Sequence, residues 1–397
     1  MRLFSLLSAI VLVPAFSYGM SFNTLCNHAY NASSDLIQTN GHLLSNTHTK
    51  AAALAGEPLS IEGSASSVIG KDPVDNGMRY GAMLNYQLKQ FGVQEAQTNY
   101  YDQNMKNLQQ EIQLQQKIIQ VILKRDWLIA LIEQEKIKIL GEKVTLSKEA
   151  ALIGQKKVTA GRMSQMELYR LQSDERTAVG EFAMGEMELE HAQHSLQESA
   201  MLHEEIVVDD LRFDFIADDN ATEERINNAA ILQILTAQIN ILDSRIKSTH
   251  YEGKEFISLG AGATHEPVQN SIDFRINIPL SISKKNDQKI AALMAEKSAL
   301  LHRRDVTHQK LQMNIHTLLE HLQTREKRYK DSLTAQKYQK TLMEMAQKGY
   351  EAGVVSQFEY LSTKNSFYDM QLRAVELKRE YIQEMSAMEE KLGRIWL

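Results

Sequence analysis

The residues best placed to do chemistry are serines and glutamates that follow two glycines. The same A-G-x-x-S-Q-x-E pattern occurs at residues 160–167 and at residues 352–359. A Ser followed three residues later by a Glu is the spacing of a helix capping box, and a Gly before it allows the positive φ that ends a helix. This capping role accounts for the residue types, and a further role as exposed turns that bind a partner or narrow a pore stays open. The residues are Gly161, Ser164 and Glu167 in the first copy and Gly353, Ser356 and Glu359 in the second.

A second group of candidate ligands lies within one predicted helix, where His191 and His194 follow Glu190. Two histidines do not complete a zinc site, so a solvated helix face is the simpler interpretation. The sequence contains no G-x-S-x-G, P-loop, G-x-G-x-x-G or H-E-x-x-H motif. We therefore expect no enzymatic activity, no metal and no cofactor.

The composition is that of a folded protein that binds no nucleic acid. The 397 residues include 44 Lys and Arg against 50 Asp and Glu, and 43% are hydrophobic. Disordered chains are less apolar, and nucleic-acid binders are basic. Residues 1–19 are typical of a secretory signal peptide, with Arg2 before a short apolar run. No later run of about 18 apolar residues predicts a spanning helix, so membrane insertion would require β-strands.

The single cysteine, Cys26, excludes an internal disulfide. Leu25 stands where an acylation signal has a small residue. We interpret Cys26 as a small buried apolar side chain, while acylation stays open.

Two regions show period-two alternation of hydrophobicity. In the second, Ile272 and Phe274 alternate with Asp273 and its polar neighbours. The alternation predicts β-hairpins at 58–88 and 256–280, with strands of about 10 residues, the length of a tilted strand that crosses a bilayer. An ordinary sheet that is covered on one face would show the same alternation.

Helices are predicted almost everywhere else, because the stretches 74–266 and 280–397 contain no proline. We expect long helices at 89–159 and 281–351, return helices at 164–202 and 356–395, and leading helices near 23–53 and 222–249. The turn motifs recur 192 residues apart, and so do Leu84-Asn85-Tyr86 and Ile276-Asn277-Ile278. The chain is therefore predicted to be a duplication, with repeats at 20–208 and 209–397 and with turns at 160–164 and 352–356.

The second turn resembles the signature of the outer membrane efflux protein family, the TolC-like exit ducts of Gram-negative bacteria. Residues 350–361, Y-E-A-G-V-V-S-Q-F-E-Y-L, are similar to the pattern Y-x-x-G-x-x-s-x-x-[DE]-[VL]-L, with Tyr360 in place of an aliphatic residue. The strand-to-helix passage at 276–280 is also similar. The resemblance implies a mainly α fold, whose long helical hairpins form a trimeric α-barrel in the periplasm. Four strands per subunit would form a 12-stranded transmembrane β-barrel in the outer membrane.

The resemblance also implies a gate at the periplasmic turns. The family has an acidic residue at the position of Glu359, and three copies would form a ring of like charge that favours cations. Its counterpart Glu167 would hydrogen-bond Tyr350 on a neighbouring helix. The best-known members have a second acidic ring where this chain has Ser362. They also have an arginine for which Arg162 would have to substitute.

The same resemblance implies the partners. These are two further copies of the chain, outer-membrane lipid, a periplasmic adaptor protein and an inner-membrane transporter of the RND, ABC or MFS class. The adaptor would dock at the turns that contain Gly161, Ser164, Gly353 and Ser356. The implied function is a passive exit duct for efflux or type I secretion. A periplasmic adaptor or coiled-coil scaffold without a barrel is the alternative, although adaptors usually have a single helical hairpin.

Overall fold

A computed structural model describes residues 21–69, 76–204, 206, 208, 222–252, 254–267, 269–279 and 284–395. The predicted signal peptide and most of the connector between the repeats lie outside these residues. The chain divides into two compact units: unit 1 contains Met1–Ser33, Gln116–Asp219 and Asn314–Leu397, and unit 2 contains Ser34–Gln115 and Asn220–Met313. Each unit therefore takes segments from both predicted repeats.

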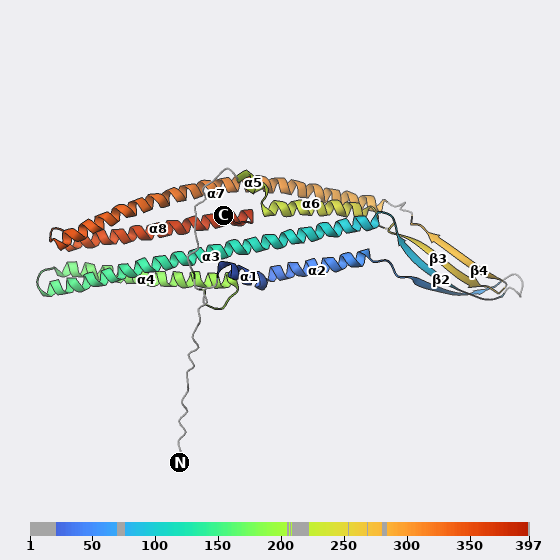
Figure 1. Ribbon diagram of the computed structural model, residues 1–397, viewed down its shortest axis with the longest axis horizontal. Coiled ribbons are helices and arrows are strands. Elements are labelled where there is room, and N and C mark those ends of the chain that lie inside the picture. Colours follow the sequence, from blue (N-terminus) through green and yellow to red (C-terminus); the bar gives the residue numbers. More distant parts are fainter. Residues whose placement is uncertain are drawn as a thin grey trace, which may run out of the picture. The chain divides into compact units, whose positions relative to one another are not determined.

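Two long helical hairpins dominate the chain (Figure 1). The first joins α3 (Val93–Thr159) to α4 (Gln165–Ala200), and the second joins α7 (Lys285–Glu351) to α8 (Gln357–Leu392). The helices α3 and α7 have 67 residues each, and α4 and α8 have 36 each. The long helices predicted from the sequence are thus confirmed to within a few residues at most ends. None of the helices in the described part of the chain is long and apolar enough to cross a membrane.

Ion pairs show which of the four helices in unit 1 are neighbours. Lys143 on α3 pairs with Glu181 on α4 at 2.8 Å, and it also pairs with Asp369 on α8 at 2.9 Å. His321 Nδ1 on α7 lies 2.9 Å from a carboxylate oxygen of Glu384 on α8. The order is therefore α4, α3, α8 and α7, as Figure 1 shows. This order places the first hairpin directly against the second.

A small hydrophobic core closes one end of α4 in unit 1. The helix α1 (Phe22–Ala32) lies on it, and the ring of Phe22 meets that of Trp127 edge to face at 6.0 Å. His28 Nδ1 lies 3.1 Å from the carbonyl oxygen of Ala200. Burial of these apolar side chains is the main force that holds α1 in place. The buried residues are Leu25, Cys26, Ala29, Leu123, Trp127, Ala130, Ala192, Leu196, Ala200, Ile206 and Val208.

Cys26 is expected to be chemically inert in the folded protein. Its side chain is buried in this core, and burial raises the pKa of its thiol to about 11. Maleimide reacts with the thiolate, so no labelling is expected near neutral pH, whereas full labelling is expected after denaturation. Mass spectrometry of both samples measures the difference. Rapid labelling of the native protein would contradict the buried position, as would an acyl chain on Cys26.

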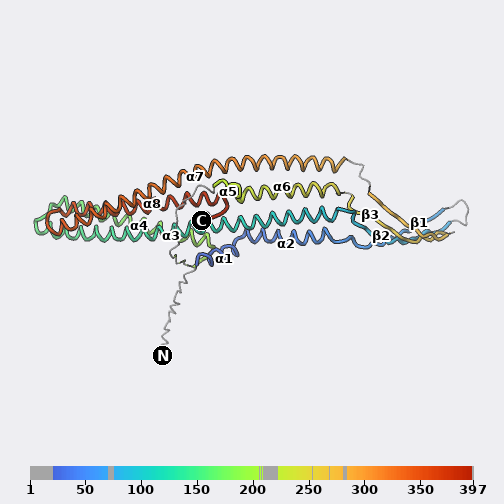
Figure 2. Tube along the Cα trace, turned by 45° about the horizontal axis from the view of Figure 1, so that its top comes forward, coloured from blue at the N-terminus to red at the C-terminus, as the bar shows by residue number. Residues whose placement is uncertain are grey.

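Unit 2 contains the leading helices that follow α1, and they run beside the first parts of α3 and α7 (Figure 2). The helix α2 (Ser34–Leu54) bonds to α3, where the Asn46 side-chain amide donates to the carbonyl oxygen of Tyr101 at 3.2 Å. The helices α5 (Thr222–Asn227) and α6 (Ala230–Thr249) accompany α7, where Lys297 pairs with Asp243 at 2.6 Å.

Helices occupy both predicted leading ranges, 23–53 and 222–249, and each range contains a break that the sequence analysis did not locate. Ser33 has an extended backbone with ψ 117° between α1 and α2, and Ala229 has ψ 137° between α5 and α6. Short polar residues lie beside both breaks, in Ser33-Ser34-Asp35 and Asn227-Asn228. Their side chains compete with the helix for backbone hydrogen bonds, so ending a helix at these residues costs little free energy.

The four strands form one antiparallel sheet in the order β1-β2-β3-β4. They are β1 (Ser60–Val68), β2 (Gly77–Lys89), β3 (Phe256–His265) and β4 (Asn270–Asn277). The two predicted hairpins are confirmed, and pairing of β2 with β3 joins them, for example at Tyr86 opposite Leu259. The sequence did not predict this union. Within the described residues β1 and β4 are the edges of the sheet.

The register places apolar side chains on one face of the sheet and polar side chains on the other. Leu84, for example, lies between Ile61 on β1 and Ala261 on β3, and Ala261 in turn lies opposite Phe274. Phe274 is 81% exposed and Ile272 75% exposed, so no residue that the structure describes covers these side chains of the apolar face. A sheet with an uncovered apolar face needs an apolar environment or a partner.

Candidate functional site

The turns of the two helical hairpins have the same backbone geometry. Gly161 has φ 67° and Gly353 has φ 74°. In the first turn the N–H of Arg162 donates to the carbonyl oxygen of Lys157 at 2.8 Å, and in the second Val354 donates to Gly349 at 2.8 Å. Each bond spans six residues and closes a Schellman motif. The predicted role of both glycines at the helix ends is therefore confirmed.

The caps of the return helices differ between the two turns. Ser164 Oγ accepts from the N–H of Glu167 at 3.2 Å, and the Glu167 carboxylate accepts from the N–H of Ser164 at 2.9 Å. These bonds complete a capping box, and the N–H and hydroxyl of Ser164, which both donate to the carboxylate, hold the pKa of Glu167 below its usual value. Ser356 Oγ accepts from the N–H of Glu359 at 3.1 Å. The Glu359 carboxylate makes no return bond within the described residues, so capping explains Ser356 but not the side chain of Glu359.

Tyr350 lies in an aromatic contact rather than beside Glu167. Its ring stacks on that of Tyr360, with centroids 5.3 Å apart and an interplanar angle of 7°. The Nζ of Lys157 lies 6.0 Å from the centre of the Tyr350 ring, and Lys157 also donates to the side chain of Gln357. Within the single chain the structure does not bring Tyr350 and Glu167 together. Tyr360, the departure from the family pattern, thus supplies the partner of Tyr350.

A groove of about 370 Å³ separates the first turn from the start of α8. Arg162 and Glu167 line its first wall, and Phe358 lines the second. Arg162 makes no ion pair with another described residue, and it lines the groove together with residues of the second hairpin. Ser362 is exposed on α8 and does not line the groove.

Replacing Gly353 by Ala is expected to loosen this turn by about 1–2 kcal/mol, because an L residue with a Cβ is strained at φ 74°. Gly180, in the interior of α4, provides a matched control with nothing within 4 Å of an added Cβ. Gly180→Ala is expected to stabilise its helix by up to about 1 kcal/mol. Hydrogen exchange of the amides at 350–356 and within α4 measures both effects. Slower exchange at the turn in Gly353→Ala would contradict the assigned geometry.

Polar pairs connect α3 to α8 along much of their length. As the α3 position rises from 124 to 157, the α8 position falls from 389 to 357, as expected for antiparallel helices in register. Lys124 Nζ lies 3.0 Å from Glu389 Oε1, and the Glu389 side chain is fully buried. These contacts between the two hairpins were not predicted. The pairs are Lys124–Glu389, Glu133–Arg379, Glu135–Lys378, Lys143–Asp369 and Lys157–Gln357.

Glu133 is the most buried carboxylate near the middle of this series. Its side chain is 1% exposed, and it pairs with Arg379 at 3.2 Å and with Lys136 at 3.9 Å. Burial raises the pKa of Glu133, and the two cations oppose the shift without cancelling it. A buried carboxylate in this position ties the hairpins together only while its cations stay close.

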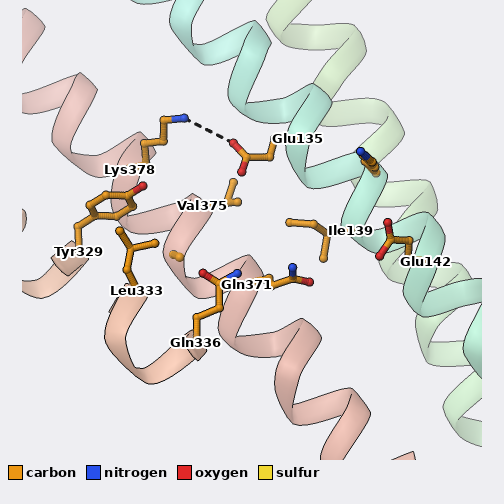
Figure 3. A pocket seen from close by; sticks show the side chains of 11 residues that line it. Glu135, Ile139, Glu142, Tyr329, Leu333, Gln336, Gln371, Val375 and Lys378 are labelled. Carbon is orange, nitrogen blue, oxygen red and sulfur yellow. Dashed lines mark hydrogen bonds and ion pairs between the residues drawn. The ribbon is translucent and has the colours of Figure 1, made fainter. Parts of the chain in front are cut away.

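A cavity of about 240 Å³ lies beside the α3–α8 pair. Figure 3 shows Glu135 and Lys378 at its rim, joined at 3.5 Å, with Ile139 and Val375 below them. Tyr329 enters from α7, and burial raises the pKa of its hydroxyl, with a smaller contribution from the charge of Glu135. Both hairpins therefore line this cavity.

The histidines on α4 bond locally. His191 Nδ1 lies 3.2 Å from Ser195 Oγ, and His194 Nδ1 lies 3.1 Å from Gln197 Oε1. Among the residues that the structure describes, no group of three His, Cys, Asp or Glu side chains is placed to hold a metal ion. The geometry of α4 thus agrees with a solvated helix face.

Comparison with solved structures finds close matches in fold. A crystal structure of CusC, reported with transmembrane channel formation, has a TM-score of 0.73 and 14% identity, over 94% of this chain and 92% of that chain. The outer membrane protein VceC from Vibrio cholerae has a TM-score of 0.69 and 13% identity, over 95% and 97%. The open state of the Neisseria gonorrhoeae MtrE outer membrane channel has a TM-score of 0.63 and 12% identity, over 94% and 89%.

No protein-family model matches the sequence, and no curated protein matches it. The likeness lies in the three-dimensional arrangement, and it extends over nearly the whole of both chains. The chain has the fold of the TolC-like outer membrane efflux channels.

Proposed function

We propose that the protein is the outer-membrane exit duct of a tripartite efflux or type I secretion system. The observation that carries the proposal is the sheet, which has an uncovered apolar face, a polar face and two edges without a described neighbour strand. Lipid would cover the apolar face, and water would fill the space next to the polar face. The fold similarity to outer membrane channels supports this assignment.

Three copies would satisfy both edges of the sheet. The strand β4 of one copy would pair with β1 of the next, and the alternation of strand direction makes this new pair antiparallel. Twelve strands would then close into a barrel without edges. The long helices would form a tunnel in the periplasm, where they would pack laterally against helices of the other copies.

The turns would form a gate at the periplasmic end. The Glu359 carboxylate is exposed and takes no part in the cap of its helix. In a trimer, three Glu359 carboxylates would therefore be available to face a central pore. A ring of carboxylates favours cations and repels itself. A periplasmic adaptor would dock on the turns, and an inner-membrane transporter would supply the energy. The duct itself would do no chemistry.

The alternative is a periplasmic scaffold, and cell fractionation separates the two. A duct is expected in the outer-membrane fraction, and as a trimer after detergent extraction, which light scattering of the purified protein measures. A scaffold would be released with the soluble periplasm. The uncovered apolar face favours the duct, because a water-soluble scaffold would have to hide it.

Glu359→Ala is expected to raise single-channel conductance in planar bilayers, because truncating three side chains widens the narrowest part of the proposed gate. Glu351→Ala is the matched control, since Glu351 is also exposed at this turn but lies at the end of α7. Conductance in this control should equal that of the unmodified protein. An unchanged conductance in Glu359→Ala would remove Glu359 from the gate.

A further inference from the structure

The polar face of the sheet carries a cluster of charges that the proposed gate does not use. In one row across the sheet Glu62 lies opposite Met83, Met83 opposite Gly262, and Gly262 opposite Asp273. In the next row on this face Asn85 lies opposite Gly260, and Gly260 opposite Arg275. The two edge strands thus hold the charges, and the two central strands hold small or neutral residues.

The Arg275 guanidinium reaches across the sheet from β4 towards β1. Its Nη1 lies 3.6 Å from Glu62 Oε2, although two strands separate the residues. The side-chain amide of Asn85 donates to the same Glu62 oxygen at 3.3 Å. Gly260 and Gly262 on β3 lie between these strands and add no side chain of their own to the polar face.

Neither Gly260 nor Gly262 has space for a side chain. A Cβ on Gly262 would lie 2.5 Å from the carbonyl oxygen of Ala82, and one on Gly260 would lie 2.7 Å from Asn85 Oδ1. A hollow of about 370 Å³ lies on this part of the sheet, and its lining includes Glu62, Asp273 and Arg275. The neutral side chains of Asn85 and Met83 therefore occupy the space over Gly260, and the charges lie at the sides of the polar face.

The second carboxylate of the cluster is held separately. The Thr264 hydroxyl donates to Asp273 Oδ2 at 2.7 Å, which fixes this carboxylate on the polar face. The cluster contains two carboxylates and one guanidinium, so it contributes one net negative charge in each copy of the chain. Glu62 and Arg275 are 58% and 60% exposed, so both are in contact with solvent and can act on passing ions.

We infer that Glu62, Asp273 and Arg275 form a second selectivity element of the conduit, in which Arg275 limits the preference for cations that the two carboxylates create. The inference rests on the proposed function, because it requires that the polar face line a water-filled lumen. Rings of charged side chains select ions by sign, and their effect extends over about one Debye length, roughly 10 Å at 0.1 M salt. The element would act on any charged cargo, at a level of the duct where the gate residues play no part.

Reversal potentials under a KCl gradient at low ionic strength test the inference. Arg275→Gln is expected to raise the permeability ratio of K⁺ to Cl⁻ by about twofold, and Glu62→Gln to lower it by about the same factor. The double variant should return close to the unmodified ratio. Opposite signs from two neighbouring substitutions cannot come from a general disturbance of the sheet.

Two further comparisons complete the test. Arg275→Lys keeps the charge and should keep the ratio, which separates charge from folding. Each variant is also combined with Glu359→Ala and measured again. A narrow gate in series with the sheet would reduce the effect of the sheet variants on the permeability ratio. Ratios that do not move in either background, or that move in the same direction, would overturn the inference and leave the proposed function intact. Absence of any current from the unmodified protein would overturn both.

Discussion

Phe274→Arg is expected to remove the protein from the outer membrane. Phe274 lies on the apolar face of β4, opposite Ala261, and it is 81% exposed. If this face meets lipid, an arginine near the bilayer midplane costs about 2–4 kcal/mol, and a trimer contains three of them. The amount of trimer in the outer-membrane fraction, measured on gels without heating, should fall at least tenfold.

The same strand supplies the control for this experiment. Asn277 lies three residues further along β4 and on the polar face, opposite Ser258. Asn277→Arg adds the same side chain on the side that would face water, so normal trimer levels are expected. Equal and normal levels for both variants would show that the apolar face does not meet lipid.

Lys124→Met is expected to destabilise unit 1 by about 3–5 kcal/mol, because it removes the cation beside a buried carboxylate. The Glu389 side chain is fully buried and the Lys124 side chain only 10% exposed. Denaturant unfolding of the detergent-solubilised protein, followed by circular dichroism, measures the loss. The double variant Lys124→Met with Glu389→Met should regain most of the stability, since apolar residues often replace a buried ion pair at little cost.

A more exposed ion pair serves as the control, because it shows how much burial adds to the stability effect of Lys124→Met. Lys50 on α2 pairs with Asp102 on α3, and their side chains are 24% and 49% exposed. Lys50→Met is expected to change the stability by no more than about 1 kcal/mol. If Lys124→Met costs as little as Lys50→Met, the Lys124–Glu389 pair does not hold the two hairpins together.

The local parts of the fold could be predicted from the sequence, because their signals are local. Gly161 and Gly353 followed by a Ser-to-Glu capping spacing defined the turns, and both turns formed as predicted. Alternating residues such as Ile272 and Phe274 defined strands that the structure confirms. Helix breaks at Ser33 and before Ala230 were missed, since short polar residues weaken a helix without always ending it.

The contacts between distant segments could not be predicted in the same way. The pairing of β2 with β3 joins segments about 170 residues apart, and no pattern within either strand specifies its partner. The pairing of Lys124 with Glu389 likewise becomes recognisable only when α3 and α8 are known to be neighbours. The spacing of residues could not separate the two candidate gate glutamates either. Glu167 and Glu359 follow their serines at the same distance in the sequence, but only Glu167 completes a capping box.

Single-channel recording with the purified, unmodified protein tests the central claim most directly. The claim is that copies of this chain close their sheets around water and conduct ions. Detergent-extracted trimers added to a planar lipid bilayer are expected to insert and to produce discrete, uniform steps of current. A soluble monomer that produces no current steps at any protein concentration or voltage would contradict the account.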